Sequence, residues 1–197
     1  NMSIKYSILL SFYLVISSFN VSLQGINYRS LVKTYADGSW SGWSAEIAKA
    51  EKSLPTDTES KFILVNLYFG YVGHFIEGGK YDVAFEYIHK GEKLIHQILA
   101  VEPSNVTAIS YKGAFLAFRV GINRINYLAT ALEGLSLIYK AYDMDNNNLI
   151  AILNKASALY FLPSVFGGNK AETIRLLNYA CSLMEKSGDT VDNWMYY

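Results

Sequence analysis

Cysteine and histidine, which often carry enzyme or metal chemistry, are scarce in this chain, and their spacing forms no recognised site. Cys181 is the single cysteine, so it can form neither an internal disulfide nor a cluster of thiolates. His89 and His96 are seven residues apart, and no HExxH spacing accompanies them. No G-x-S-x-G nucleophile motif occurs either. The sequence therefore predicts a protein that is not an enzyme and has no metal site and no cofactor.

Two adjacent glycines, Gly167 and Gly168, precede an amphipathic segment, a position where glycines can cradle phosphate. A phosphate-binding loop requires a preceding strand and the motif G-x-x-x-x-G-K-[ST], and the sequence has neither here. Glycine supplies the positive φ of a tight turn, and Asn169 with Glu172 has the spacing of a helix-capping pair. We therefore expect a turn between two helices, with Phe166 fixing the turn onto the core.

Apolar and small residues recur three and four positions apart along most of the chain, which is the spacing of one buried helix face. The stretches with this spacing are SAEIAKAEKSL, KYDVAFEYIHKGEKLIHQILAV, ATALEGLSLIYKAYDM and KAETIRLLNYACSLMEKSG. Sustained two-residue alternation is hard to find, so we expect an all-α fold. Lys and Arg number 17, as do Asp and Glu, so the charge gives no indication of a nucleic-acid partner.

The helical stretches align with one another when a small residue late in each is placed in one column. That column, where neighbouring helices must come close, contains Ala50, Gly91, Ala141 and Ala180. The column seven residues earlier contains Trp43, Ala84, Gly134 and Thr173, and the column three residues earlier contains Ile47, Ile88, Ile138 and Leu177. Glycines twelve residues before the first column are Gly38, Gly79 and Gly168. The columns predict repeated helix pairs with glycine at the turn.

The stretches GGKYDVAFEYIHKG and GSWSGWSAEIAKAEKSLP resemble the second half of a tetratricopeptide repeat, G-x-Y-x-x-A-x-x-x-Y-x-x-A…P. The resemblance implies an α-α superhelix over residues 26–197, a short tetratricopeptide-like (TPR-like) solenoid of about four antiparallel helix pairs. The four small residues of the first column are 41, 50 and 39 residues apart, whereas the period of the family is about 34 residues. We therefore expect elongated helices.

The first helix of each pair lines the concave face of a tetratricopeptide fold, so the resemblance implies binding positions on these helices. They are Asn66, Phe69 and Gly73 in the second unit and Tyr111, Phe115 and Arg119 in the third. The alternative is that the aromatic rings pack between helices. We expect the aromatic end of the chain, DNWMYY, to pack back on the fourth unit or to meet another copy, because a helical stack needs a polar terminal cap.

Residues 1–25 differ in composition from the rest of the chain. Lys5 is followed by a fourteen-residue apolar run, Tyr6 to Phe19, which is typical of a secretory signal peptide and short for a membrane span. The alternative is a buried first helix in a cytoplasmic protein. We expect export to a bacterial periplasm or cell surface, and membrane association only through this segment if it is not cleaved.

Two functions are consistent with these features. The first is a non-enzymatic scaffold that binds a peptide or a partner protein in a concave helical groove. The second is a periplasmic small-molecule-binding accessory protein associated with a transporter component. It is based on the turn from Pro163 to Gly168, P-x-x-F-G-G, which resembles the T-component of periplasmic tripartite transporters. A carrier requires a cavity of at least roughly 300 Å³, whereas a scaffold requires an open face.

Overall fold

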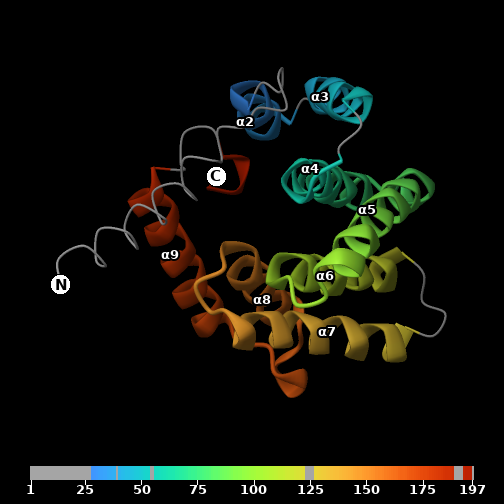
Figure 1. The fold of residues 1–197 in the computed structure, drawn as a ribbon. Helices are drawn as coiled ribbons and strands as arrows, with labels where there is room; N and C mark the ends of the chain where they lie inside the picture. The colour runs from blue at the N-terminus through green and yellow to red at the C-terminus, as the bar shows by residue number, and fades with distance from the viewer. Residues whose placement is uncertain (1–27, 39, 54–55, 123–126, 189–192, 197) are drawn as a thin grey trace, which may run out of the picture.

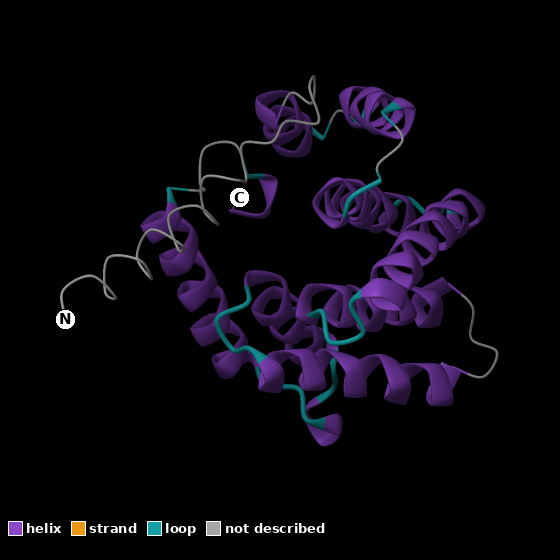
Figure 2. Ribbon diagram, in the orientation of Figure 1, coloured by secondary structure: helices purple, strands orange, loops and turns teal. Residues whose placement is uncertain are grey.

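The computed structural model describes residues 28–38, 40–53, 56–122, 127–188 and 193–196, and these residues form helices joined by short turns (Figure 2). The predicted signal segment, residues 1–25, lies outside the described residues. In chain order the elements are α2 (Tyr28–Asp37), α3 (Ser41–Lys52), α4 (Thr58–Glu77), α5 (Tyr81–Val101), α6 (Val106–Ile122), α7 (Tyr127–Met144), α8 (Leu149–Phe161), η2 (Ser164–Phe166), α9 (Lys170–Ser187) and η3 (Trp194–Tyr196). No strand occurs in these described ranges, and the expectation of an all-α fold is confirmed.

Consecutive helices pack as hairpins. The largest contacts join α6 with α7, α4 with α5, and α8 with α9, and smaller ones join α2 with α3. Helix α6 also contacts α4, α5 and α8, so the second and third hairpins meet through α6 (Figure 1). The first two hairpins meet through α3 and α4, and the last two through the contacts of α8 with both α6 and α7. The expected elongation of the helices is found, since α4 has 20 residues and α5 has 21.

The small residues of the first sequence column lie where helices meet, as predicted. Ala50, Ala141 and Ala180 are at most 1% exposed, and Gly91 is buried as well. A Cβ atom on Gly91 would lie 2.5 Å from the buried ring of Phe115, so only glycine fits there without a shift. The column seven residues earlier is buried in all four units.

Helices α6 and α7 approach each other closely at a pair of glycines. A Cβ atom on Gly113 would lie 2.6 Å from the carbonyl oxygen of Gly134, and a Cβ atom on Gly134 would lie 3.0 Å from the carbonyl oxygen of Gly113. The two glycines therefore let the two helices pack backbone against backbone.

The column three residues before the first is buried in three units and exposed in the fourth. Ile47, Ile88 and Ile138 are buried, but Leu177 is 41% exposed and Leu176 takes the buried position. Helix α9 packs mainly on α8, and among the described elements no further helix pair covers its other side. Its buried face is therefore narrower and leaves Leu177 in solvent.

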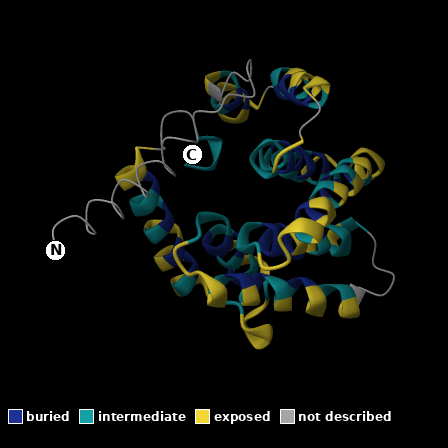
Figure 3. Ribbon diagram, in the orientation of Figure 1, coloured by how far each residue is buried: buried dark blue, intermediate teal, exposed yellow. Residues whose placement is uncertain are grey.

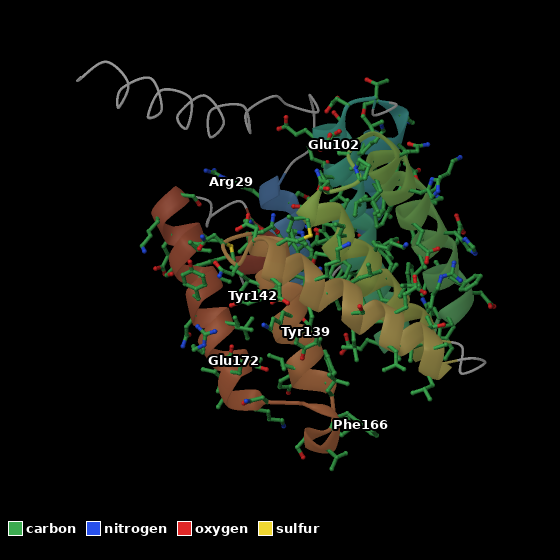
Figure 4. All side chains as sticks on the ribbon, turned by 60° about the horizontal axis from the view of Figure 1, so that its bottom comes forward. Arg29, Glu102, Tyr139, Tyr142, Phe166 and Glu172 are labelled. Atoms are coloured by element: carbon green, nitrogen blue, oxygen red, sulfur yellow. The ribbon has the colours of Figure 1, made fainter. Side chains whose placement is uncertain are left out.

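The turn between α8 and α9 forms largely as predicted, with one correction. Asn169 caps α9 by accepting a hydrogen bond from the backbone N–H of Glu172 at 3.0 Å, and Gly167 has a φ of 92°. Phe166 does not fix the turn onto the core, because its side chain is 72% exposed. The hydrogen bond from the Phe166 N–H to the Pro163 carbonyl closes η2 within the turn itself, and the side chain points away from the helices (Figure 4).

Candidate functional site

A pocket of about 160 Å³ lies among the first helices of the hairpins, and we call it the inner pocket. Its lining residues belong to α2, α4, α6, α8 and η3. The residues lining it are Tyr35, Phe69, Tyr111, Ile150, Leu153, Asn154, Ser157, Trp194 and Met195. Most of this lining is aromatic or aliphatic, with two polar side chains on α8. Such a surface suits an apolar group that carries one hydrogen-bonding atom.

Asn66 on α4 joins the pocket wall to η3. Its carboxamide oxygen accepts a hydrogen bond from the indole N–H of Trp194 at 2.7 Å, and its NH₂ group donates to the Tyr111 hydroxyl at 2.8 Å. The same NH₂ group lies 3.3 Å from the sulfur of Met195. Asn66 thereby fixes three of the residues around the pocket in one arrangement.

The aromatic wall is held by ring contacts on both sides. The Phe69 and Tyr111 rings meet edge to face with centroids 5.5 Å apart, and the Trp194 ring lies 5.4 Å from that of Tyr35 and 5.2 Å from that of Trp43. Burial raises the pKa of the Tyr111 phenol well above its usual value, and the hydrogen bond from Asn66 opposes this shift. The phenol is therefore neutral and serves as a hydrogen-bonding group at physiological pH.

The polar side of the pocket is on α8. Asn154 is 4% exposed and donates to the Ser110 hydroxyl at 2.9 Å, and that hydroxyl in turn donates to the carbonyl oxygen of Ile150 at 3.3 Å. Ser157, three residues further along the same helix, is exposed at the pocket rim. The wall on this side is thus fixed at its base and accessible at its edge.

The structure brings three of the six predicted binding residues together at the inner pocket. Phe69 and Tyr111 line it, and Asn66 supports it. Phe115 is fully buried against Gly91, so its ring has no free surface.

The other two predicted residues lie apart from the pocket. Gly73 does not line the pocket, and its Cβ position faces open space, with no atom of a neighbouring element within 4 Å. Arg119 forms a bidentate ion pair with Glu92, and its guanidinium lies 5.0 Å from the centre of the Phe85 ring. Half of the predicted set is therefore elsewhere on α4 and α6 or within the core.

Several pocket residues were not among the predicted binding positions, and one of them left a signal in the sequence. Asn154 is a polar residue within the apolar stretch LIAILNKASALYF, the pattern of a buried amide that needs a partner. Tyr35 and Ser157 have no comparable local signal, because their place in the pocket depends on contacts between distant helices.

A second hollow, of about 390 Å³, lies over α3, α4 and α5, and we call it the outer hollow. Glu51 accepts hydrogen bonds there from the Tyr68 hydroxyl at 2.8 Å and from Lys90 at 3.1 Å. Burial, followed by the hydrogen bond to Glu51, raises the pKa of the Tyr68 phenol far above its usual value. Thr56 and Lys93 on its rim are exposed, so this hollow is a shallow surface feature rather than an enclosed cavity.

Comparison with known proteins assigns no family, since no family model, curated protein or solved structure matches the chain. Within the described ranges, no three His, Cys, Asp or Glu side chains gather where they could hold a metal ion. None of the described helices has the length and apolar character that crossing a membrane requires.

Proposed function

We propose that this protein is a non-enzymatic interaction scaffold with a TPR-like arrangement of helix pairs, and that its inner pocket holds an apolar side chain of a bound peptide or partner protein. The observation that carries the proposal is the size of the pocket together with its lining. A volume of about 160 Å³ suits one large side chain, whereas pockets for small molecules typically measure about 300 to 1,000 Å³. Buried anchors of this kind dominate the energy of many protein interfaces.

The arrangement of the hairpins supports a tetratricopeptide-like solenoid. Helices α4, α6 and α8 are the first helices of successive hairpins, and α6 contacts both of the others. Stacking of first helices on one another produces the concave face of such repeats. The inner pocket is lined by these same helices, which is where the resemblance places the binding surface.

The carrier function has weaker support. The inner pocket has about half the volume that a carrier requires, and the outer hollow is shallow with an exposed rim. A transporter component is one class of partner protein that the scaffold would bind, because the turn from Pro163 to Gly168 resembles the T-component of tripartite transporters.

Substitutions at the exposed rim test the scaffold proposal without disturbing the core. Ser157→Phe fills the mouth of the pocket, and Ser157→Ala at the same position leaves it open. Peptides selected from a displayed library of random sequences are resynthesised, and their Kd values are measured by fluorescence anisotropy. We expect Ser157→Phe to weaken binding by about tenfold or more and Ser157→Ala to change it by less than about twofold, because an anchor pocket accounts for over 1.4 kcal/mol.

Two outcomes would contradict the scaffold. Equal affinity of the Ser157→Phe and Ser157→Ala proteins would place the peptide elsewhere on the molecule. A lipid or other small ligand that copurifies with the wild type, together with the absence of any selected peptide, would favour the carrier.

Export is a separate part of the proposal. The support is the run from Tyr6 to Phe19 with Lys5 before it. Mass spectrometry of the protein from its native host should find a mature chain that begins near residue 26. Cytosolic protein that retains Met2 would contradict export.

A further inference from the structure

Four large apolar side chains project into solvent at the end of the α8–α9 hairpin, and we call them the apolar knob. They are Tyr160, Phe161, Val165 and Phe166, with 50%, 81%, 82% and 72% of their surfaces exposed. Figure 3 shows this end of the hairpin as an exposed projection, and Figure 4 shows Phe166 at its tip. Large apolar side chains grouped in this way on a soluble surface usually mark an interaction site.

The knob is held rigidly by the backbone of the turn. The N–H groups of Phe166 and Gly168 both donate to the Pro163 carbonyl, at 2.9 and 3.1 Å, and the Asn169 N–H donates to the Leu159 carbonyl at 3.0 Å. A Cβ atom on Gly168 would lie 1.8 Å from the Leu162 carbonyl oxygen, so this packing requires glycine. The turn therefore presents its apolar side chains in a fixed, outward position.

The size and shape of the knob fit a bilayer better than a protein surface. A whole aromatic residue has a surface of about 150 to 250 Å². With the exposed fractions given above, the four side chains together expose roughly 500 Å². A stable protein interface buries about 800 Å² on each partner. A narrow projection with aromatic tips is instead suited to the boundary between lipid headgroups and acyl chains, where aromatic residues concentrate in membrane proteins.

The charges beside the knob fit an anionic lipid surface. The Lys170 ammonium lies 5.3 Å from the centre of the Tyr160 ring. The acidic side chain next to the turn, Glu172, is neutralised by a bidentate ion pair with Arg175 at 2.7 Å. The chain as a whole has no net charge, so Lys170 gives the turn a local positive charge.

We propose that the apolar knob inserts into the interface of a membrane that contains anionic lipids, with Lys170 at the level of the headgroups. The aromatic tips supply the apolar area and Lys170 supplies the attraction, the two contributions that together determine interfacial binding. This contact is independent of the inner pocket and is additional to the membrane contact expected for the N-terminal segment.

Vesicle binding by the full chain tests the proposal. The probes are vesicles of phosphatidylcholine alone and vesicles of equal parts phosphatidylcholine and phosphatidylglycerol. The double variant Phe161→Ser/Phe166→Ser is compared with Leu128→Ser/Leu132→Ser, which removes two apolar side chains on α7 that are 61% and 59% exposed. We expect the knob variant to lose about tenfold or more in partitioning to the anionic vesicles, and the α7 variant to lose less than about twofold.

Binding through residues 6–19 could hide a difference between these variants, so the knob also needs a local probe. Phe166→Trp places an indole at the tip, and brominated lipids quench an indole that enters the bilayer. We subtract the fluorescence of the wild type, which contains three tryptophans, from that of Phe166→Trp. In anionic vesicles the remaining emission, from the indole at position 166, should shift to the blue and be quenched by the brominated lipids. The absence of quenching at position 166 overturns the proposal. Self-association that Phe161→Ser/Phe166→Ser abolishes also overturns it, because the knob would then contact a second copy.

Discussion

Replacement of Gly113 by alanine should destabilise the protein even though alanine is the better helix former. The added Cβ atom would lie 2.6 Å from the Gly134 carbonyl oxygen and 2.8 Å from a side-chain carbon of Ile138. The first distance is about 0.8 Å short of the 3.4 Å at which ordinary contact begins. Because the obstacle is a backbone atom inside a helix, the clash is relieved only if α6 and α7 move apart.

The energetic balance can be estimated from two opposing effects. Gly→Ala in a helix gains about 1 kcal/mol in propensity. If α6 and α7 move apart by about 0.5–1 Å, each dispersion contact between them loses roughly a quarter to a half of its attraction. Overpacking of this kind costs about 1 to 3 kcal/mol, occasionally more. The α6–α7 contact is the largest in the molecule's described part, so we expect a net loss of about 2 kcal/mol. For a chain of this length that corresponds to a fall in Tm of about 4 to 8 °C.

Gly73→Ala is the matched control. Gly73 lies within α4, and no neighbouring atom lies within 4 Å of its Cβ position. This variant should therefore gain about 1 kcal/mol in free energy of unfolding. Urea denaturation followed by circular dichroism measures both proteins. Shifts of the same sign for Gly113→Ala and Gly73→Ala would refute the argument that the backbone contact controls this position.

Two further predictions concern hydrogen bonds. Asn66→Ala leaves the Tyr111 hydroxyl and the Trp194 indole without their partner, so the free energy of unfolding should fall by about 1–3 kcal/mol. In a Tyr111→Phe background the same change should cost less, and equal costs in urea denaturation would show that the bond to Tyr111 contributes nothing. At the start of α4, hydrogen bonds from the Ser60 hydroxyl and N–H lower the pKa of Asp57. A lowered pKa in the folded state stabilises the protein above about pH 4, and this contribution is lost as the pH falls further. Asp57→Asn keeps the cap without the ionisation, so the stability difference between wild type and Asp57→Asn should shrink between pH 7 and pH 3 in the same assay. A stability difference that stays the same from pH 7 to pH 3 would contradict this contribution of the Asp57 carboxylate.

The sequence predicts the helical frame well because that frame depends on local spacing. Three- and four-residue periodicity identifies the buried faces, and small residues such as Gly91 mark where helices must come close. The exception, Leu177, depends on which helices surround α9, and no local pattern contains that information. Phe166 was misplaced for a similar reason, since a turn that satisfies its own hydrogen bonds does not need the core.

The candidate site was harder to predict than the fold. Phe69 and Tyr111 were identified because they lie on the first helices of their hairpins, but the same argument included Phe115. The absence of a side chain on Gly91 admits the Phe115 ring into the space between helices, a pairing across different hairpins. The contribution of Trp194 depends on its hydrogen bond to Asn66, 128 residues earlier in the chain. A local three- or four-residue pattern cannot predict a contact between segments so far apart in sequence.

That long-range contact has a consequence for how the chain unfolds. Repeats that touch only their neighbours lose structure one unit at a time, so their ends fray independently. Here the Trp194 side chain joins Asn66 and Tyr35, and the Tyr196 hydroxyl donates to Glu185 on α9. The first and last hairpins are therefore coupled, and opening either end releases contacts at the other. The described helices should unfold cooperatively, and closure of this long loop should be a late, entropically costly step of folding.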